Sequence, residues 1–170
     1  TAHIKLFDIL DFAKIEAGKL MINPSSFNLI DAVESTIRTH KKHALEKCLE
    51  MTVSYDHIIS NFVISDSMRL KQIINNLISN AIKFTNQGSV KIAVSQELLP
   101  GKEDEVIVKI AISDTGIGVP KEKAEAVFER FVKLNQYVQG TGLGLSLCRI
   151  IVERLGGKIW LDTSYTEGAR

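Results

Sequence analysis

Four segments of the chain carry apolar side chains at every third or fourth position, which is the spacing of an α-helix. They are residues 1–18, 28–47, 66 to about 84, and about 142–155. In residues 1–18 the apolar positions cover more than one side, as in a helix buried within a bundle, and Gly18 is predicted to end that helix. The helix over 66–84 has one continuous apolar face, which we expect to pack on a sheet. That face comprises Leu70, Ile73, Ile74, Leu77, Ile78 and Ala81.

Other segments are β-rich or alternate between apolar and polar residues, which predicts strands. They are 50–54, 61–64, 89–96, 105–113 and 158–161. Pro100-Gly101 separates the two longest of these strands and predicts the turn of a hairpin. Helices and strands do not alternate as βα units, so the chain is predicted to form a mixed α/β fold with antiparallel strands.

A long stretch with neither pattern runs from Val119 to Gly140 and contains one short helical piece near residues 121–128. Connections inside compact domains are usually shorter than about 12–15 residues, and longer ones are mostly functional or mobile. We therefore expect this stretch to take part in function.

Composition limits the kinds of partner. Lys and Arg total 21 and Asp and Glu total 20, so there is no basic excess of the kind that binds nucleic acid or an anionic membrane. Cys48 and Cys148 lie outside any CxxC pair, so they indicate neither a zinc site nor a disulfide framework, and a reducing cytosol is expected. No apolar run reaches the roughly 18 residues of a membrane span, and no signal peptide is recognised, so we expect a soluble chain.

One stripe of the predicted helix 66–84 is polar. Asn76, Asn80 and Lys83 fall within roughly 60° of each other, opposite the apolar face, because each residue turns a helix by about 100°. An amide oxygen can ligate a hard cation such as Mg²⁺, and a lysine can contact phosphate. The stripe suits a metal–phosphate ligand, although these three residues alone more often form an ordinary solvated face. Asparagine is, however, a poor residue for a helix interior.

Two glycine-rich segments suggest ligand contacts. Residues 114–118, DTGIG, follow the strand 105–113, and the carboxylate can accept from an exocyclic amine such as that of adenine; alone, the segment also fits a simple turn. Residues 140–145, GTGLGL, precede the last helix, where backbone N–H groups can hold phosphate oxygens. A dinucleotide-binding fingerprint with Asp162 as its acidic residue is excluded by the GxGxG spacing and the lack of a βαβ unit, and no P-loop motif occurs.

The segments RLKQIINNLISNAIKFT, DTGIG, FERF and GTGLGL, in this order and at these separations, closely resemble the N, G1, F and G2 boxes of histidine kinase catalytic domains. The resemblance implies an α/β (α+β) two-layer sandwich of the Bergerat type, with a mixed, mostly antiparallel sheet and helices on one face. It assigns residues 21–170 to the catalytic ATP-binding domain, with a lid at about 119–140. LFDILDFAKIEAGKL resembles the end of the second helix of the dimerisation and phosphotransfer hairpin, which assigns residues 1–20 to that hairpin.

The resemblance also implies roles for single residues. Asn80 matches the Mg²⁺ ligand, Asn76 a polar group near the metal and phosphates, and Lys83 a phosphate contact; Asn76 and Lys83 are thus expected to act in catalysis. Asp114 matches the carboxylate that reads the adenine amine. The other matches are Phe84 beside the nucleotide, Gly116 and Gly118 in the pocket wall, Phe128 and Phe131 in the F box, Lys133 where the family often has arginine, and Gly140, Thr141, Gly142, Leu143 and Gly144 in the phosphate loop.

ATP and Mg²⁺ are therefore the implied ligands, and the implied reaction transfers the γ-phosphoryl group of ATP to a histidine for relay in two-component signalling. The family's acceptor histidine lies in the first hairpin helix and is followed by an acidic residue, a pair that this sequence lacks. We interpret His3, His40, His43 and His57 as surface or cap residues and expect the acceptor outside these 170 residues. The family also continues into a final strand beyond YTEGAR.

The implied partners are ATP, the acceptor helix of the same protein or of its dimer mate, and the receiver domain of a response regulator, with no nucleic acid. The implied parent is a homodimeric, membrane-associated sensor with this part in the cytoplasm, while these 170 residues alone need not dimerise.

Two alternatives are open. One is a related ATPase of the gyrase, chaperone and mismatch-repair group, which would hydrolyse ATP with a glutamate at the Asn76 position. Asn76 argues against it, because an amide cannot act as a general base. A non-enzymatic module with a decayed ATP site would keep only the amino-terminal helix for dimerisation. The presence of Asn80, Asp114 and both glycine loops argues against such decay.

Overall fold

The computed structural model describes residues 11, 13–15, 17, 19–132 and 142–170. The elements, in chain order, are β1 (Ser25–Asn28), α2 (Leu29–Glu46), β2 (Glu50–Asp56), β3 (Phe62–Ser65), α3 (Ser67–Phe84), β4 (Ser89–Leu98), β5 (Val106–Asp114), two short 3₁₀ helices, η1 (Lys121–Lys123) and η2 (Ala126–Phe128), and α4 (Gly144–Arg154). The predicted elements between residues 28 and 155 are confirmed to within a few residues, with the short helical piece split into two 3₁₀ turns. The predicted helix over residues 1–18 lies mostly outside the described residues, although positions 11 and 13–15 are helical.

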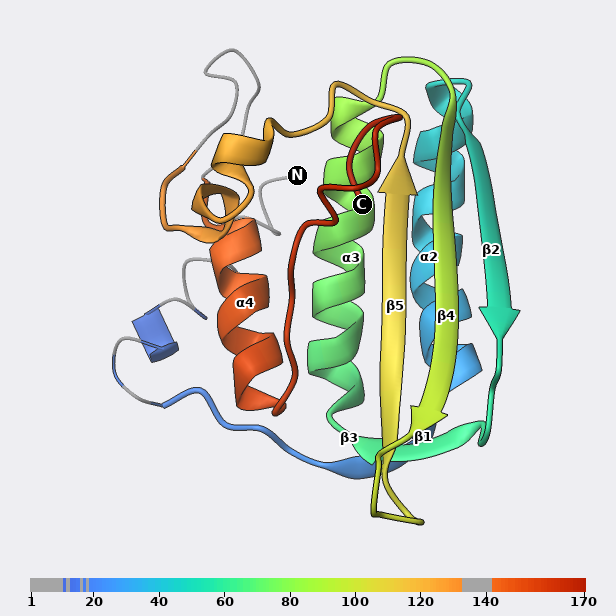
Figure 1. The fold of residues 1–170 in the computed structure, drawn as a ribbon, viewed down its shortest axis with the longest axis vertical. Helices are drawn as coiled ribbons and strands as arrows, with labels where there is room; N and C mark the ends of the chain where they lie inside the picture. Colours follow the sequence, from blue (N-terminus) through green and yellow to red (C-terminus); the bar gives the residue numbers. More distant parts are fainter. Residues whose placement is uncertain (1–10, 12, 16, 18, 133–141) are drawn as a thin grey trace.

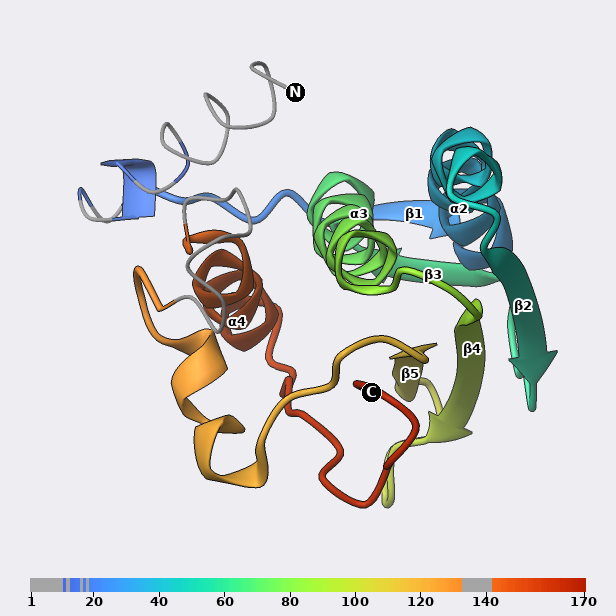
Figure 2. The ribbon, with the colours of Figure 1, turned by 90° about the horizontal axis from the view of Figure 1, so that it is seen from above.

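The strands form a three-stranded sheet, in the order β2-β4-β5, and a separate pair, β1-β3. β2 runs parallel to β4, whereas β4-β5 and β1-β3 are antiparallel. Helices α2, α3 and α4 lie on one side of the larger sheet (Figures 1 and 2). The predicted two-layer α/β arrangement, with a mixed sheet and helices on one face, is therefore confirmed.

Two buried clusters hold the layers together. The larger joins α2 and α3 to the sheet through residues such as Ile37, Ile78 and Ile92. The smaller joins α3 to α4 and to the amino-terminal segment, and includes Ile73 and Ile151. α3 contributes to both clusters and is therefore the central element of the helical layer.

The apolar face predicted for this helix divides between two neighbours, so the expectation that all of it packs on the sheet is wrong in part. Ile74, Ile78 and Ala81 pack in the larger cluster, against the sheet and α2. Ile73 and Leu77 pack in the smaller cluster, against α4. The period of the sequence located the face, but it could not reveal that α4 covers one flank of it.

Partly buried side-chain hydrogen bonds stabilise both ends of α3. The Asp66 carboxylate accepts from the backbone N–H of Arg69 at 3.0 Å and caps the first turn. At the other end the Lys47 ammonium donates to the carbonyl oxygens of Ile82 at 2.6 Å and Thr85 at 2.7 Å. A cation at the carboxyl end of a helix satisfies its last carbonyls and complements the helix dipole. Lys47 thereby fixes the end of α3 that carries Lys83 and Phe84.

The predicted strand at Lys158–Leu161 is wrong, because these residues form no strand in the structure. Within the described residues β5 is paired only with β4, so no strand lies beside 158–161 to complete a ladder. The segment instead follows α4 (red in Figure 1), where Ile159 packs against the smaller cluster. An alternating sequence forms a strand only when a neighbour supplies hydrogen bonds.

Candidate functional site

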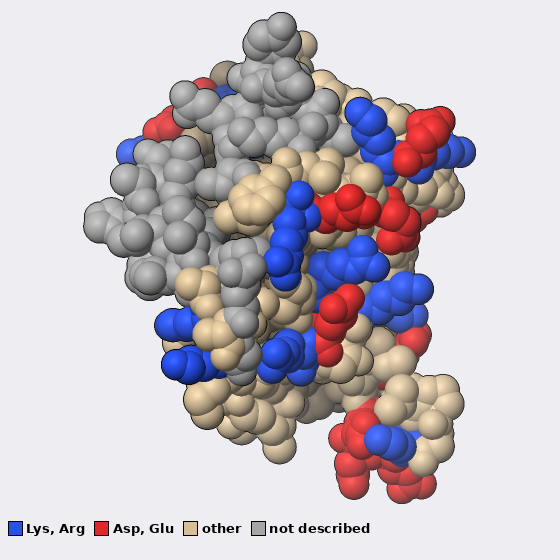
Figure 3. Space-filling model, turned by 90° about the vertical axis from the view of Figure 1, so that its left-hand side faces the viewer, with Lys and Arg blue, Asp and Glu red and all other residues tan. Residues whose placement is uncertain are grey.

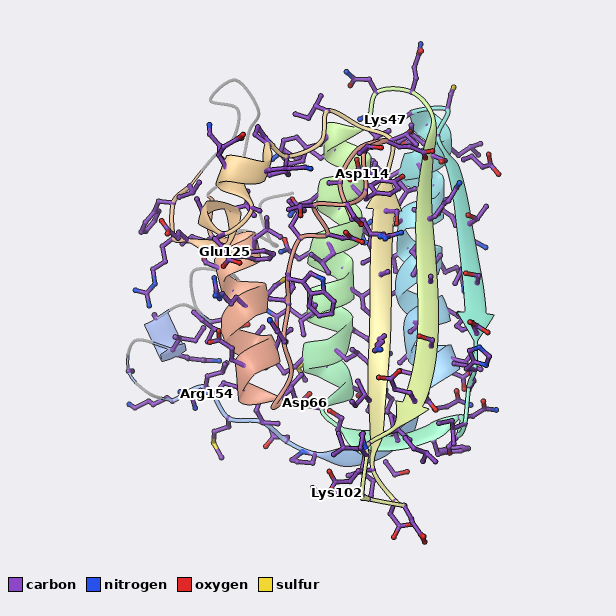
Figure 4. All side chains as sticks on the ribbon, viewed as in Figure 1. Lys47, Asp66, Lys102, Asp114, Glu125 and Arg154 are labelled. Carbon is purple, nitrogen blue, oxygen red and sulfur yellow. The ribbon has the colours of Figure 1, made fainter. Side chains whose placement is uncertain are left out.

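The predicted site residues gather at one end of the molecule. The carboxyl ends of α3 and β5 and the amino end of α4 all lie at the upper end of Figure 1. Asp114 is the last residue of β5 and lies beside the upper part of α3 (Figure 4). Segments far apart in sequence thus meet because α3 and β5 end, and α4 begins, on the same side.

Asp114 is buried and only one of its carboxylate oxygens is occupied. The residue as a whole is 7% exposed. Oδ1 accepts from the backbone N–H of Gly116 at 2.8 Å and of Ala169 at 3.3 Å. Within the described residues Oδ2 has no hydrogen-bond partner, and since no buried side-chain oxygen or nitrogen there lacks a partner, Oδ2 faces solvent. The arrangement leaves one oxygen oriented to accept from a ligand.

The surroundings of Asp114 also change its acidity. Burial raises the pKa of the carboxyl group, and the hydrogen bonds from Gly116 and Ala169 lower it without cancelling the rise. A buried carboxylate gains more from a further donor than an exposed one, because water competes less for it.

Gly116 joins the loop after β5 to the end of α3. A Cβ atom at this position would collide with the carbonyl oxygen of Phe84 and would lie 2.9 Å from Asp114 Oδ1. The same carbonyl accepts from the backbone N–H of Ile117 at 3.3 Å. The predicted glycine therefore permits a close backbone approach, which brings Phe84 next to Asp114.

Asn76 lies against the first turns of α4. Its Nδ2 donates to Cys148 Sγ at 3.1 Å, and a Cβ on Gly144 would lie 2.5 Å from Asn76 Oδ1. Gly144 and Cys148 are one helical turn apart on α4, so the amide is held between them. Asn76 of the polar stripe and Gly144 of the predicted phosphate loop are thus in direct contact.

The other two stripe residues lie farther along α3. Asn80 is half-buried and its side chain makes no hydrogen bond within the described part of the chain. Lys83 is half-buried, with Nζ 4.9 Å from the centre of the Phe84 ring. Both residues follow Asn76 on the same side of α3, towards the end that meets Gly116.

The F box packs against the start of α4. The backbone N–H of Phe131 donates to the carbonyl of Gly142 at 3.0 Å, and Phe128 is buried beneath Arg149, whose guanidinium is 5.9 Å from the ring centre. Leu143 is buried. Three further predicted residues, Lys133, Gly140 and Thr141, lie outside the described residues, as does the adjoining part of the proposed lid.

Sequence reasoning missed the carboxyl-terminal segment that packs against Asp114. The backbone N–H of Asp114 donates to the carbonyl of Ala169 at 2.9 Å, and a Cβ on Gly168 would collide with the carbonyl of Asp114. Gly118 meets the same segment, since its Cβ would lie 3.0 Å from the Gly168 carbonyl oxygen. Gly168 was the only local signal, and a single glycine does not reveal its partner.

His40, which the sequence predicted to be a surface or cap residue, is half-buried. Its Nε2 pairs with Asn75 Oδ1 at 2.7 Å between α2 and α3. Burial lowers the pKa of this imidazole, and the hydrogen bond to Asn75 only partly offsets that effect. The residue connects two helices, away from the stripe.

The charge of the surroundings is mixed. On the face that shows α4 and its neighbours, basic and acidic side chains are interspersed (Figure 3). No group of three or more His, Cys, Asp or Glu residues that could hold a metal occurs among the described residues. A divalent cation here would therefore depend on amide oxygens, water and the ligand's own phosphates, which is how Mg²⁺ is commonly bound.

Comparison with known proteins identifies a family and several relatives. A family model described as "Histidine kinase-, DNA gyrase B-, and HSP90-like ATPase" matches residues 65–170. "Sensor histidine kinase GacS" of Pseudomonas protegens is 39% identical over 167 residues, which cover 95% of this chain and 18% of that protein. The chain therefore spans less than a fifth of the length of that relative.

Two solved structures share the fold. Full-length ShkA in complex with AMPPNP gives a TM-score of 0.81 at 26% identity, over 95% of this chain and 33% of that one. The histidine kinase ThkA in complex with the response regulator protein TrrA gives a TM-score of 0.67 at 25% identity, over 99% of this chain and 46% of that one. No helix in the described residues is both long and apolar enough to span a membrane.

Proposed function

Since this chain belongs to the family of histidine kinase-, DNA gyrase B-, and HSP90-like ATPases and is homologous to sensor histidine kinases, we propose that it binds Mg²⁺–ATP and transfers the γ-phosphoryl group to a histidine outside these residues. Residues 21–170 form the catalytic ATP-binding domain in this proposal, and residues 1–20 are the end of a dimerisation and phosphotransfer hairpin.

One observation carries the proposal. The polar stripe of α3 reaches both glycine loops, since Asn76 lies against Gly144 and Phe84 lies against Gly116. ATP has the exocyclic amine of adenine at one end and a chain of phosphates at the other. The site matches such a ligand. The carboxylate of Asp114 lies at one loop, where it can meet the amine, and the amides and the lysine lie along the stripe, where they can meet the phosphates.

Each group has a role that its chemistry supports. Asp114 Oδ2 accepts from the adenine amine, and Phe84 packs beside the base. Backbone N–H groups at the amino end of α4, beginning at Gly144, bind phosphate oxygens, because that end of a helix carries partial positive charge. Lys83 contributes a further positive charge to the phosphates. Phosphoryl transfer depends mainly on such positioning and charge neutralisation.

Asn80 is the proposed Mg²⁺ ligand. Its half-buried side chain lies between Asn76 and Lys83 on the stripe, and the described residues contain no carboxylate cluster that would compete for the ion. Bound Mg²⁺ supplies charge neutralisation between the phosphates. Asn76 sits where a hydrolytic relative would need a general base, and its amide, bonded to Cys148, cannot remove a proton from water.

The first prediction separates binding from transfer. Calorimetric titration of the 170-residue chain with ATP and Mg²⁺ is expected to give one binding site, while incubation with γ-labelled ATP leaves the chain unlabelled. The reason is that no histidine with a neighbouring acid is present to accept the group. Acid-labile phosphate on the chain would contradict the assignment of the acceptor, and absence of binding would contradict the nucleotide site.

The second prediction concerns the metal. Asn80→Ala is expected to weaken ATP binding in the presence of Mg²⁺ about fivefold, since losing one polar contact costs on the order of 1 kcal/mol and 1.4 kcal/mol is a factor of ten. Binding measured with EDTA is expected to change little. Asn86→Ala, an exposed asparagine just beyond α3, is the matched control. Equal losses with and without Mg²⁺ would argue against Asn80 as a metal ligand.

The proposed partners follow from the same function. They are the acceptor helix of the same protein or of its dimer mate, and a response regulator receiver domain; the ThkA–TrrA complex supports the latter for a related fold. We propose that the parent is a homodimeric, membrane-associated sensor whose catalytic part is cytoplasmic.

A further inference from the structure

A partly buried network of charged and polar groups connects the amino-terminal segment to α3. Arg69 Nη1 donates to Asp11 Oδ2 at 2.8 Å and to Gln72 Oε1 at 2.7 Å, and Gln72 Nε2 donates to the same Asp11 oxygen at 2.7 Å. The side chains of Asp11 and Arg69 are 11% and 13% exposed. Each member of the triangle thus contacts the other two.

The ionisation of Asp11 follows from this network. Burial acts to raise the pKa of its carboxyl group, but the hydrogen bonds from Arg69 and Gln72 outweigh it, and the pKa is lowered. The carboxylate is therefore charged at neutral pH, and an ion pair that is so little exposed is screened weakly by salt.

Two further contacts attach the same segment farther along. The backbone N–H of Asn23 donates to Asp66 Oδ2 at 2.9 Å, and Arg154 Nη1 donates to the carbonyl of Leu20 at 3.4 Å. Leu20 itself is buried in the cluster between α3 and α4. Asp66 and Arg154 lie at the lower ends of α3 and α4 (Figure 4), so residues 19–24 cross beneath both helices (Figure 1).

The network shares a helix face with the proposed nucleotide site. Gln72 is one turn before Asn76, which is one turn before Asn80, so the polar stripe of α3 continues into the network. A small pocket between α3 and α4 is lined by both Gln72 and Asn76, together with Gly144. The face that meets the phosphates at one end therefore holds the amino-terminal segment at the other.

We propose that Asp11, Arg69 and Gln72 form a latch that fixes the direction in which the amino-terminal segment leaves the catalytic domain. Opening the latch frees Asp11 and residues 19–24 from α3 while the sheet and the nucleotide site remain folded. The importance of this motion rests on the proposed function, in which this segment is the end of the second hairpin helix and the acceptor lies in the first hairpin helix. A closed latch holds the phosphate site in one orientation relative to that helix, and an open one allows it to turn.

Hydrogen exchange measured by mass spectrometry tests the latch in the 170-residue chain. Asp11→Ala and Arg69→Met are each expected to accelerate exchange in a peptide spanning residues 19–24 at least tenfold, and to increase tryptic cleavage after Lys14 and Lys19. The double variant is expected to exceed the larger single effect by less than twofold, because both changes break one network. Peptides from β4 and β5 are expected to exchange as in the wild type.

Glu97→Gln is the matched control, because Glu97 forms a 2.8 Å ion pair with Lys109 that is about half exposed; it is expected to leave the exchange of 19–24 unchanged. Unchanged exchange at 19–24 in both latch variants overturns the proposal. Equal acceleration throughout the sheet also overturns it, since the network would then support global stability and would not act as a latch.

ATP titration of each variant distinguishes failure of the latch proposal from failure of the proposed function. The latch variants are expected to bind ATP within twofold of the wild type, whereas failure of the wild type to bind ATP refutes only the proposed function.

Discussion

Asp114→Asn is expected to abolish ATP binding at ordinary ligand concentrations while the protein stays folded. Oδ1 accepts from two backbone N–H groups, those of Gly116 and Ala169. An asparagine keeps its carbonyl oxygen on these donors, so its NH₂ group replaces Oδ2. In the proposed complex that group would face the adenine amine, donor against donor. Loss of a charged hydrogen bond costs roughly 1.5–3 kcal/mol, which corresponds to a 10- to 150-fold weaker affinity, and the opposed donors add to it.

Asp114→Asn is expected to weaken ATP binding without lowering the stability of the protein. Because the folded-state pKa of Asp114 is raised by burial, the neutral carboxyl stabilises the folded state at low pH. That contribution is lost as the pH rises through the raised pKa, so at pH 7 the ionised group opposes folding. The thermal midpoint of Asp114→Asn at pH 7 is therefore expected at or above that of the wild type. A large drop in the midpoint would mean that lost binding reflects unfolding.

A pH series supplies the control. Protonation weakens Asp114 as an acceptor, so wild-type affinity for ATP is expected to fall as the pH is lowered from neutral towards the raised pKa. The residual binding of ATP by Asp114→Asn, measured at high nucleotide concentration, is expected to lack this loss of affinity at low pH. If ATP binds the variant as tightly as the wild type, or if both lose affinity in parallel, Asp114 does not contact the base.

Gly116→Ala is expected to have the second largest effect. The added Cβ would collide with the backbone carbonyl of Phe84, which cannot move without displacing the end of α3. It would also crowd Asp114 Oδ1. Inserting a methyl group into a packed site costs about 1–3 kcal/mol. We expect a fall in the free energy of unfolding of this size, measured by urea denaturation, together with at least tenfold weaker ATP binding.

Gly157→Ala is the matched control for this substitution. Its Cβ would approach the side chain of Val152 at 3.2 Å, a flexible neighbour that can shift. Neither glycine has a positive φ that a side chain would strain. The two variants therefore differ in the atoms that the added methyl group contacts, which are a backbone carbonyl for Gly116→Ala and a side chain for Gly157→Ala. If both lose stability and affinity equally, the contact between Gly116 and Phe84 does not shape the site.

The sequence was sufficient to predict which elements form the helical and strand layers. The apolar spacing over residues 66–84 and the alternation in 89–96 and 105–113 reflect local geometry, and both were confirmed. The ordered motifs also identified Asp114 and the glycines around it as a unit, because a carboxylate at the end of a strand followed by glycines has few structural uses. Local chemistry of this kind is encoded in neighbouring residues and can be deduced from them.

The strand predicted at 158–161 illustrates what local pattern cannot provide. Its alternation is genuine, but within the described residues no strand lies beside it, and a β-strand is a property of a pair. The divided apolar face of α3 has a similar cause, since α4 comes from residues more than sixty positions later.

By itself, then, the sequence determined the helices, most strands and the residue types of the site, because these depend on spacing along the chain. Only the tertiary structure decided that Ala169 would hold Asp114, that Asn76 would lie between Gly144 and Cys148, and that Asp11 would bind Arg69. Those contacts join residues separated by 55 to 72 positions. They depend on how the layers stack, and no periodicity in the sequence records that.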